Sequence, residues 1–411
     1  MLIPSIDLYD GKAVQWRQGK EHVLAREDVF ALLEEFSLYG EPAVIDLNAA
    51  TGKGDNRALI EAMLRVRPVR VGGGIRDLET ARHYLKAGAS KIILGTAARA
   101  DWVKKLPREA LIFAVDSRGD YLVTHGWQQS SEVRTLDVLA DMGAGCSEFL
   151  YTQVEKEGMM QGLDEERVRA VVAASPVPVT VAGGITTLED VALLNKLGAN
   201  GQVGMALYTG KLNLADCIDV SVDWSKADLM PTIVQEAGSG NVLMLAYSNR
   251  ESLRAALEER RGIYWSRSRK ELWRKGDTSN HIQKLLRVDV DCDGDTLLFV
   301  VEQTGPACHL NRHSCFAGVS PRFGLDRLDA VLAERRATMP EGSYTAELFA
   351  SAALQAEKLR EECEELIEAE AFADVRWEAA DLLYFTLVSA RARGVGLNDI
   401  INELRSRHGH A

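Results

Sequence analysis

Three features are scarce or absent in this sequence, and each shortage excludes a class of protein. Six cysteines among 411 residues are too few for a disulfide-stapled secreted scaffold. No apolar run approaches the roughly 18 residues that suggest a membrane span, and residues 1–7 lack the basic start of a signal peptide. Positive charge is also deficient, with 48 Lys+Arg against 60 Asp+Glu. An acidic chain has no overall field to attract nucleic acid or anionic membranes, so we expect a cytoplasmic protein that binds neither.

The sequence does contain enough apolar material for several packed domains. Hydrophobic residues make up 46% and charged residues 26%, the usual balance of globular proteins. At about 100–200 residues per domain, a chain of 411 residues is expected to hold two to four domains. With a net charge of −12, an anionic substrate would need local cationic side chains, backbone N–H groups or bound metal.

The first half of the chain contains an internal repeat. Residues 69–79 (VRVGGGIRDLE) align with residues 179–189 (VTVAGGITTLE) at an offset of 110. Short β-branched runs, such as 42–47 and 111–116, alternate with helical patterns in both halves. This predicts a (β/α)8 TIM barrel over residues 1–218, built from two half-barrels. A doubly wound open sheet is the alternative.

Glycine-rich turns follow equivalent predicted strands in each half. They contain Gly73, Gly74, Gly95 and Thr96 in the first half, and Gly183, Gly184 and Gly204 in the second. Such turns let backbone N–H groups approach a phosphate, although either turn alone could be an ordinary tight turn. Two of them in equivalent positions predict a small ligand that is phosphorylated at both ends.

Carboxylates close the first strand of each half. Asp7 and Asp116 are predicted to point into the C-terminal mouth, where barrel enzymes place catalysis. Two carboxylates on opposite sides of a substrate can act as general base and general acid. The alternative is that each aspartate caps a following helix or turn.

Residues 3–8 (IPSIDL), 72–76 (GGGIR) and 182–185 (AGGI) resemble the ProFAR isomerase family of histidine biosynthesis. That resemblance implies an Amadori rearrangement of a bisphosphorylated aminoaldose, with Asp7 as the base that takes the C2 proton. The family's acid lies in a Thr-x-x-x-x-Asp-Gly segment, which corresponds here to Thr152 through Gly158 with Glu157 as the acid. Further departures from the family pattern are Gln15, Asn48 and Met205. A catalytically degenerate barrel is therefore the alternative.

A second module begins beyond the polar segment 219–228. Cys292, Cys308 and Cys315 fall within 24 positions, and three thiolates with one open coordination position suit catalytic zinc. His309 adjoins the second cysteine and could assist catalysis. Isolated cysteines are also common as small buried apolar residues, which is the alternative.

Asp291, Asp293 and Asp295 alternate along the same stretch. On a strand the three carboxylates would project from one face, with Cys292 on the other, and their hard oxygens would attract Mg²⁺. The alternative is an acidic turn around Gly294.

Cationic, hydroxyl and aromatic residues precede the aspartates and suit a phosphoribosyl ligand with a stacked base. They are Trp265, Arg267, Arg269, Lys275, Thr278, Ser279 and His281. A solvated basic loop is the alternative. With residues 291–295 (DCDGD) and 305–309 (GPACH), these segments resemble phosphoribosyl-AMP cyclohydrolases over residues 229–318.

That resemblance implies a small α+β metal-binding domain, with zinc on the three cysteines and Mg²⁺ near the three aspartates. A zinc-activated water would open the adenine ring. In that family the zinc ligands come from two subunits, which implies at least a homodimer.

The last segment, 325–411, is rich in Ala, Glu, Leu and Arg at helical spacing and predicts an all-α domain. Carboxylates recur at i, i+3 and i, i+4 spacings, which would gather them on facing helices as a Mg²⁺ site. They are Glu361, Glu362, Glu365, Glu378 and Asp381. A solvated acidic face is the alternative. The Glu-Glu-x-x-Glu and Glu-x-x-Asp pattern resembles phosphoribosyl-ATP pyrophosphohydrolases, which implies metal-assisted attack of water on a triphosphate.

The three resemblances together imply consecutive steps of one pathway. The leading hypothesis is a multidomain, trifunctional enzyme of histidine biosynthesis that acts on phosphoribosyl nucleotides and uses Zn²⁺ and Mg²⁺. The alternative is a bifunctional cyclohydrolase and pyrophosphohydrolase whose barrel serves binding or assembly. A weaker third hypothesis is a generic metal-dependent nucleotide hydrolase.

Overall fold

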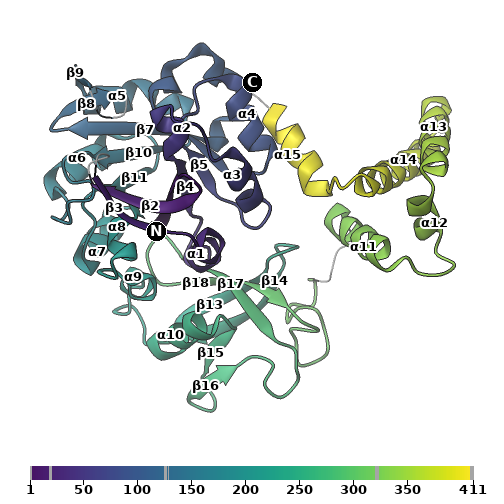
Figure 1. Ribbon diagram of the computed structural model, residues 1–411. Helices are drawn as coiled ribbons and strands as arrows, with labels where there is room; N and C mark the ends of the chain where they lie inside the picture. The colour runs from purple at the N-terminus through teal and green to yellow at the C-terminus, as the bar shows by residue number, and fades with distance from the viewer. Residues whose placement is uncertain (1, 18–20, 125–126, 128, 320–323, 408–411) are drawn as a thin grey trace. The chain divides into compact units, whose positions relative to one another are not determined.

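The computed structural model describes residues 2–17, 21–124, 127, 129–319 and 324–407. The chain divides into two compact units, residues 1–320 with 405–411 and residues 321–404. The first unit contains the barrel and the middle module, and the second contains the helical domain (Figure 1). None of the described helices is both long and apolar enough to cross a membrane.

Eight parallel strands close into a ring in the first unit (Figure 1). They are β1 (Leu2–Tyr9), β4 (Ala43–Asp46), β5 (Arg70–Gly72), β6 (Lys91–Leu94), β7 (Leu111–Arg118), β10 (Glu148–Gln153), β11 (Val179–Ala182) and β12 (Asn200–Val203). Parallel pairing of β12 with β1 and of β10 with β7 completes the ring. The predicted TIM barrel is therefore confirmed, and the open doubly wound sheet is excluded.

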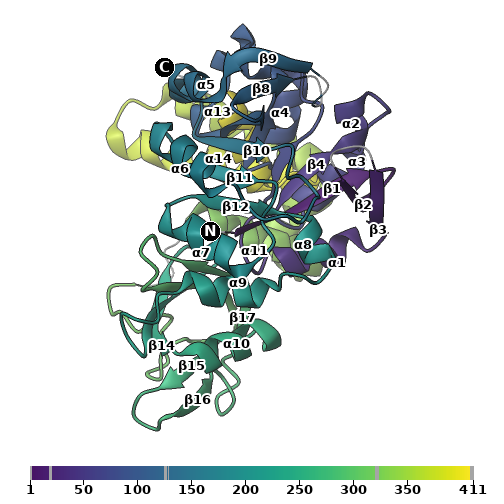
Figure 2. The ribbon, with the colours of Figure 1, turned by 90° about the vertical axis from the view of Figure 1, so that its left-hand side faces the viewer.

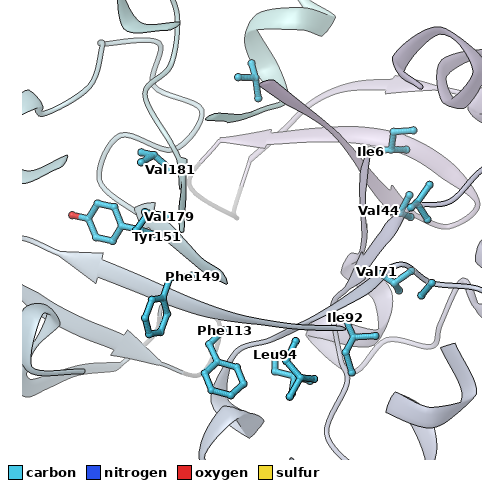
Figure 3. Packing of buried hydrophobic residues seen from close by; sticks show 14 of the residues in the cluster. Ile6, Val44, Val71, Ile92, Leu94, Phe113, Phe149, Tyr151, Val179 and Val181 are labelled. Atoms are coloured by element: carbon cyan, nitrogen blue, oxygen red, sulfur yellow. The ribbon is translucent and has the colours of Figure 1, made fainter. Parts of the chain in front are cut away.

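Helices surround the ring and cover the outward side chains of its strands. They are α1 (Val29–Phe36), α2 (Leu47–Thr51), α3 (Arg57–Leu64), α4 (Leu78–Lys86), α5 (Thr135–Met142), α6 (Glu165–Ala174), α7 (Leu188–Lys196), α8 (Met205–Tyr208) and α9 (Leu214–Ser221). Four short 3-10 helices are η1 (Thr96–Arg99), η2 (Asp101–Lys105), η3 (Arg108–Ala110) and η4 (Gly143–Gly145). Ile6, Val44 and Phe113 belong to the large apolar cluster around the ring (Figure 3).

The internal repeat also determines where equivalent helices begin. Asp77 accepts a hydrogen bond from the backbone N–H of Thr80 and starts α4. One repeat later, Thr187 accepts from the N–H of Asp190 and starts α7. These caps satisfy backbone N–H groups that the first helical turn leaves without partners.

Each half-barrel also contains two antiparallel strands that the sequence analysis did not predict. β2 (Lys12–Arg17) and β3 (Glu21–Arg26) follow β1, and β8 (Tyr121–Thr124) and β9 (Gln129–Arg134) follow β7. β2 pairs with β1 and β8 pairs with β7, so both excursions leave the ring at equivalent points.

The barrel interior is filled by side chains. An apolar layer consists of Ile3, Ala43, Ile93, Ile112, Leu150 and Ala182. At the first residues of β5, β6 and β10, a buried charge network closes the N-terminal end. Glu148 is 2% exposed, and its carboxylate lies 2.6 Å from Arg70 Nη1 and 2.9 Å from Lys91 Nζ. An active site would therefore lie at the other end of the barrel, where the strands have their C-termini.

The middle module is a small α+β domain, as predicted (Figure 2). Its four-stranded sheet has the order β14 (Val242–Ser248), β13 (Met230–Glu236), β18 (Leu297–Gln303) and β17 (Gln283–Val290). A hairpin of β15 (Ile263–Ser266) and β16 (Glu271–Arg274) and helix α10 (Arg250–Glu259) complete it. Its apolar core includes Leu38, Ile218 and Val222 from the barrel region, which joins the two modules into one unit.

The helical unit is all-α, as predicted. Its helices are α11 (Leu325–Thr338), α12 (Tyr344–Ala350), α13 (Ala352–Glu368), α14 (Phe372–Ala392) and α15 (Leu397–Arg407). Leu332, Leu348, Phe385 and Val388 lie in its small core. The last four residues of the predicted domain 325–411 lie outside the described residues.

The buried network at the N-terminal end of the barrel yields a stability prediction. Glu148→Ala would remove the carboxylate that Arg70 and Lys91 share, leaving Arg70 with only the longer 3.5 Å contact to Glu41. We expect the free energy of unfolding of the barrel to fall by roughly 3–5 kcal/mol, measured by denaturant titration. Glu165→Ala is the control, because it breaks only the exposed pair with Arg169 and should cost less than about 1 kcal/mol. Equal losses in the two variants would contradict a compensating role for Glu148.

Candidate functional sites

The barrel mouth gathers the acidic residues predicted for the isomerase site. Asp7 lies on the same side of β1 as the interior residue Ile3, because side chains alternate along a strand. By the same alternation Asp116 points inward from β7, and Thr152 lies directly opposite it on β10. Thr152 hydrogen-bonds the Asp116 carboxylate, and Glu157 lies close enough to both aspartates for their charges to act on it.

The carboxyl groups at this mouth favour protonation. Burial raises the pKa of Asp7 to about 6, although a 2.7 Å hydrogen bond from Ser5 opposes the shift. Burial, followed by repulsion from Asp7 and Asp116, raises the pKa of Glu157 to about 7. Burial also raises the pKa of Asp116, against hydrogen bonds from Thr152 and Trp127. Near neutral pH the mouth can therefore hold a deprotonated base and a protonated acid at once.

The helix-capping alternative for Asp7 and Asp116 is not observed. Neither residue is the N-cap of a described barrel helix, whose acidic caps are Asp28, Asp46, Asp77 and Asp164. The helix-capping form of the alternative is therefore excluded for the described barrel helices.

Backbone carbonyl oxygens pack closely against Gly73 and Gly183, one glycine of each predicted phosphate cradle. Gly73 and Gly183 both have positive φ, at 91° and 83°. A Cβ atom would lie 2.3 Å from the Asp46 carbonyl oxygen at Gly73 and 2.7 Å from the Gln153 carbonyl oxygen at Gly183. Only glycine therefore fits either position without rearrangement of the neighbouring loop.

The two cradles have different polar neighbours. A cavity of about 210 Å³ lies beside the first cradle, lined by Gly73 and Gly74 and by the charged residues Asp55, Arg57 and Arg76. At the second cradle, the Gln15 side chain lies over Gly204, where a Cβ atom would be 2.6 Å from its Oε1. The Gln15 amide nitrogen is buried and has no hydrogen-bond partner among the described residues. A neutral donor therefore lies at the second cradle.

The departure Asn48 has a local structural reason. Its side-chain amide donates to Asp10 Oδ1 at 2.7 Å, and its Oδ1 accepts from the Asp10 backbone N–H at 2.8 Å. Asn56 also donates to this oxygen at 2.9 Å. An aspartate at position 48 would place two carboxylates in contact, so asparagine suits the turn between β1 and β2. The sequence analysis missed the contribution of Asp10 and Asn56, because only the fold brings them to Asn48.

Two of the three predicted zinc ligands lie side by side. Backbone hydrogen bonds from Ala307 to His313 and from Cys308 to Arg312 fold the segment back, so that the Cys308 thiol hydrogen-bonds Cys315. Burial and the neighbouring Cys308 raise the pKa of the Cys315 thiol. Buried Lys275 lies near both sulfur atoms.

Cys292 lies at the opposite end of strand β18 from Cys308 and Cys315. It lies in the turn before β18, whereas Cys308 follows the far end of that strand, roughly 20 Å along. Within the described part of the chain, no group of three possible metal ligands includes a cysteine. Two thiols of one chain fit zinc chemically, but one chain does not assemble the predicted trio.

The aspartate triad lies on a turn around Gly294, which was the stated alternative to the strand arrangement. β17 ends at Val290 and β18 begins at Leu297. Asp291 Oδ1 accepts from the backbone N–H groups of Asp295 at 2.9 Å and Thr296 at 3.0 Å, and Gly294 has a φ of 76°. The turn nevertheless brings one oxygen of each carboxylate within 4.8 Å of the others, which suits a divalent cation.

Only some of the predicted nucleotide-binding residues lie near the thiols of Cys308 and Cys315. His281 packs against Gly305, two residues before Ala307, and Lys275 faces the thiols. The Arg267 guanidinium lies 3.8 Å from the centre of the Tyr247 ring, and Arg269 contacts Glu271 at 2.8 Å. The remaining predicted residues lie on β15 or in exposed positions: Trp265, Thr278, Ser279 and His309.

The helical unit brings three of its five predicted ligands together. Glu362 and Glu365 on α13 and Glu378 on α14 have carboxylate oxygens within 4.8 Å of one another. Burial and repulsion from Asp381 and Glu365 raise the pKa of Glu362, and burial followed by repulsion from Glu365 raises that of Glu378. Lys358 contacts Glu361 at 2.7 Å and lies 3.9 Å from Glu362. Of the three clustered carboxylates Glu362 is buried and Glu365 is exposed, and their mutual repulsion would be relieved by a bound cation.

Comparison with known families gives three matches in order along the chain. The profile of the family described as histidine biosynthesis protein matches residues 1–213, which is more than half of the chain. The chain belongs to the histidine biosynthesis family. The phosphoribosyl-AMP cyclohydrolase family matches residues 244–317, and the phosphoribosyl-ATP pyrophosphohydrolase family matches residues 325–408. The resemblances predicted for the three segments are confirmed.

Relatives of this member of the histidine biosynthesis family combine the modules differently. A histidine biosynthesis bifunctional protein from Bacillus subtilis is 44% identical over 191 residues, covering 44% of this chain and 91% of the relative. A histidine biosynthesis trifunctional protein from Kluyveromyces lactis is 49% identical over 168 residues, covering 40% of this chain. Another from Neurospora crassa is 37% identical over 331 residues, covering 79% of this chain. The chain spans only 21% and 35% of these two trifunctional proteins.

The raised pKa of Glu157 predicts a dependence of stability on pH. Because the folded-state pKa of about 7 exceeds the ordinary 4.5, the stability contributed by this group is present at pH 4 and is lost as the pH rises through 7. Glu157→Gln should match the wild type at pH 4 and exceed it at pH 8 by on the order of 1 kcal/mol, discounted because the side chain contacts solvent.

Urea unfolding of the full chain, followed on barrel peptides by pulsed hydrogen exchange, measures this difference. Glu166→Gln is the matched control, because Glu166 is exposed on α6. A difference between Glu157→Gln and the wild type that is the same at both pH values would show that the carboxyl group does not titrate as described.

Proposed function

We propose that this chain catalyses three successive steps of histidine biosynthesis. The helical domain would hydrolyse phosphoribosyl-ATP to phosphoribosyl-AMP and pyrophosphate, the middle domain would open the adenine ring to give ProFAR, and the barrel would isomerise ProFAR to its ketose form. The observation that carries the proposal is the order of three family matches on one chain. We place the domains at 1–218, 229–318 and 325–411 and the protein in the cytoplasm.

The proposed isomerase chemistry uses the unequal acidities at the barrel mouth. Asp7, with a pKa of about 6, would be deprotonated near neutral pH and take the C2 proton of the substrate. Glu157, with a pKa of about 7, would keep its proton and donate it to the ring oxygen. Thr152 would orient Asp116 through their hydrogen bond, and the glycine-rich turns would hold the two phosphates.

The proposed ring opening requires a second copy of this chain. Cys308 and Cys315 of one copy, with Cys292 of another, would hold Zn²⁺, which lowers the pKa of water to about 7 when bound. Lys275 and His281 border this position and would bind the phosphoribosyl group, with Arg267, Arg269, Trp265, Thr278 and Ser279 around it. His309 would hold or move a proton during ring opening. Asp291, Asp293 and Asp295 would bind Mg²⁺.

The proposed pyrophosphohydrolase site would use Glu362, Glu365, Glu378 and Asp381 to bind Mg²⁺ and, through it, the triphosphate of an ATP-derived substrate. The same domain exposes large apolar side chains that a second copy would cover. Ile367, Phe372 and Trp377 are 79%, 83% and 67% exposed, which is unusual for a monomer. We therefore propose a homodimer or larger assembly.

The second candidate function is a bifunctional enzyme whose barrel serves binding or assembly. The observation that favours it is the neutral Gln15 amide over Gly204, because a dianionic phosphate at the second cradle would meet no guanidinium from this position. Under this hypothesis ProFAR would accumulate.

A product assay separates the two candidates. Supplied with phosphoribosyl-ATP and followed by chromatography, the purified wild-type chain should form the ketose isomer. Asp7→Asn should accumulate ProFAR, with isomerisation reduced by about 10²–10⁴-fold through loss of the base. Asp101→Asn, an exposed carboxylate paired with Lys104, is the control and should behave as the wild type. Accumulation of ProFAR by the wild type would support the second candidate.

Complementation between variants tests the shared zinc. Cys292→Ser and Cys308→Ser chains should each lose ring opening, because each removes a ligand from every site. After co-refolding in equal amounts, half of the dimers are mixed, and each mixed dimer holds one intact site, so roughly a quarter of the wild-type activity should return. A mixture of Cys308→Ser and Cys315→Ser chains is the control and should remain inactive. Activity that does not return in the first mixture would refute ligands from two chains.

A further inference from the structure

Lys226 places its ammonium group inside the aspartate triad of the middle domain. The residue lies in the segment between α9, which ends at Ser221, and β13, which begins at Met230. Its Nζ is 2.6 Å from Asp293 Oδ2, 3.1 Å from Asp295 Oδ2 and 2.9 Å from the Asp293 carbonyl oxygen. A single cationic side chain therefore contacts two of the three carboxylates, 67 and 69 residues away in the sequence.

The segment that carries Lys226 is held against the triad by other contacts as well. The Asp223 backbone N–H donates to the Gly294 carbonyl oxygen at 2.7 Å, and the Lys226 N–H donates to the Asp223 carbonyl oxygen at 3.1 Å. Gly294 has no room for a side chain, because a Cβ atom would lie 3.0 Å from the Ser221 carbonyl oxygen. The backbone thus delivers Lys226 to the triad in a preorganised position.

The connection continues toward the barrel. Trp224 donates from Nε1 to the Asp219 carbonyl oxygen at 3.2 Å, and the Arg250 guanidinium lies 5.1 Å from the centre of the Trp224 ring. Arg250 also contacts the Asp219 carboxylate. Residues 219–226 therefore join the last helix of the barrel to both α10 and the triad.

We propose that Lys226 is a built-in competitor for the divalent cation of the triad, and that entry of the cation releases residues 222–226 from the turn. The inference rests on the proposed binding of Mg²⁺ by Asp291, Asp293 and Asp295. Mg²⁺ requires oxygen ligands at about 2.0–2.1 Å in near-octahedral geometry. An ammonium group in contact with two of the three carboxylates takes the same space, and two cations at that separation repel.

The tether makes this competition effective. Lys226 is attached to the same unit, so its local concentration at the triad is on the order of millimolar or higher and does not fall on dilution. Its side chain is 36% exposed, so the contact is screened by solvent and remains displaceable. Metal binding to the triad would thereby weaken the contact between residues 222–226, which follow the last barrel helix, and the aspartate turn of the middle domain.

Hydrogen exchange of the full chain during Mg²⁺ titration tests this proposal, because it reports on each site separately. Peptides covering 289–297 report on the triad, peptides covering 219–228 report on the segment of Lys226, and peptides covering 358–381 report on the helical site. In the wild type, Mg²⁺ should protect 289–297 and, over the same concentration range, increase exchange in 219–228.

Lys226→Met removes the competitor without adding bulk. The Mg²⁺ concentration at the midpoint for 289–297 should fall roughly three- to tenfold, as expected for a partly exposed charge contact, while that for 358–381 stays unchanged. Lys226→Arg should keep the wild-type midpoint within about twofold. Lys284→Met is the matched control, because it removes an exposed lysine from the same domain that lies near Glu302 instead of the triad.

Equal midpoints in the wild type and Lys226→Met would overturn the proposal. So would Mg²⁺ protection of 289–297 with no change in 219–228, or no effect of Mg²⁺ on 289–297 in either protein. Ring opening is assayed separately on the same samples. Competition without ring opening would refute the proposed function of the domain and leave the role of Lys226 standing.

Discussion

The closure of the strand ring decides where charge can lie inside the barrel. Once β7 pairs with β10 and β1 pairs with β12, every second side chain of each strand points into a narrow interior. At the N-terminal end the inward charge is compensated, because Glu148 meets Arg70 and Lys91. At the C-terminal end Asp7, Asp116 and Glu157 have no such partner in the described part of the chain; burial raises the pKa of each, and repulsion from the two aspartates adds to the shift at Glu157.

The other two acidic clusters also bring carboxylates close together, but their negative charge is balanced in different ways. In the helical unit, Glu362, Glu365 and Glu378 repel one another, and the nearby Lys358, 3.9 Å from the Glu362 carboxylate, offsets only part of that repulsion. In the middle domain, Lys226 crosses from the barrel side and neutralises part of the triad. Close carboxylates are thus treated in three ways. In the barrel mouth they favour protonation, in the helical unit they could bind a metal, and in the middle domain a lysine pairs with them. The difference lies in burial and in which neighbour the backbone brings close.

Periodicity and repetition were sufficient to predict the architecture of this chain. Buried runs bounded by glycine predicted the barrel strands, and the 110-residue offset predicted how the halves correspond. The position of Asp7 and Asp116 at the ends of equivalent strands also predicted that both side chains share one opening. The strand signals are local and can be recognised in a short window, and the repeat becomes visible when distant windows are compared.

Features that depend on distant contacts escaped prediction. The alternating aspartates at 291–295 left a strand and a turn around Gly294 open, and the backbone N–H groups that Asp291 caps decide for the turn. β3 and β9 are rich in polar and charged residues, and the apolar stretches of β2 and β8 are shorter than the one that marked the ring strand β7. Lys226 could not be assigned to the triad, because nothing near it in sequence indicates a partner 67 residues away.

The antiparallel strand pairs β2–β3 and β8–β9 bear on how the duplicated barrel arose. Both depart from the first strand of a half-barrel and return before its first helix, in the same antiparallel arrangement. Two independent insertions would have no reason to choose equivalent points and the same form. The two antiparallel pairs therefore extend the two-fold repeat of the barrel beyond its ring strands, as a single duplicated segment that included such a pair would.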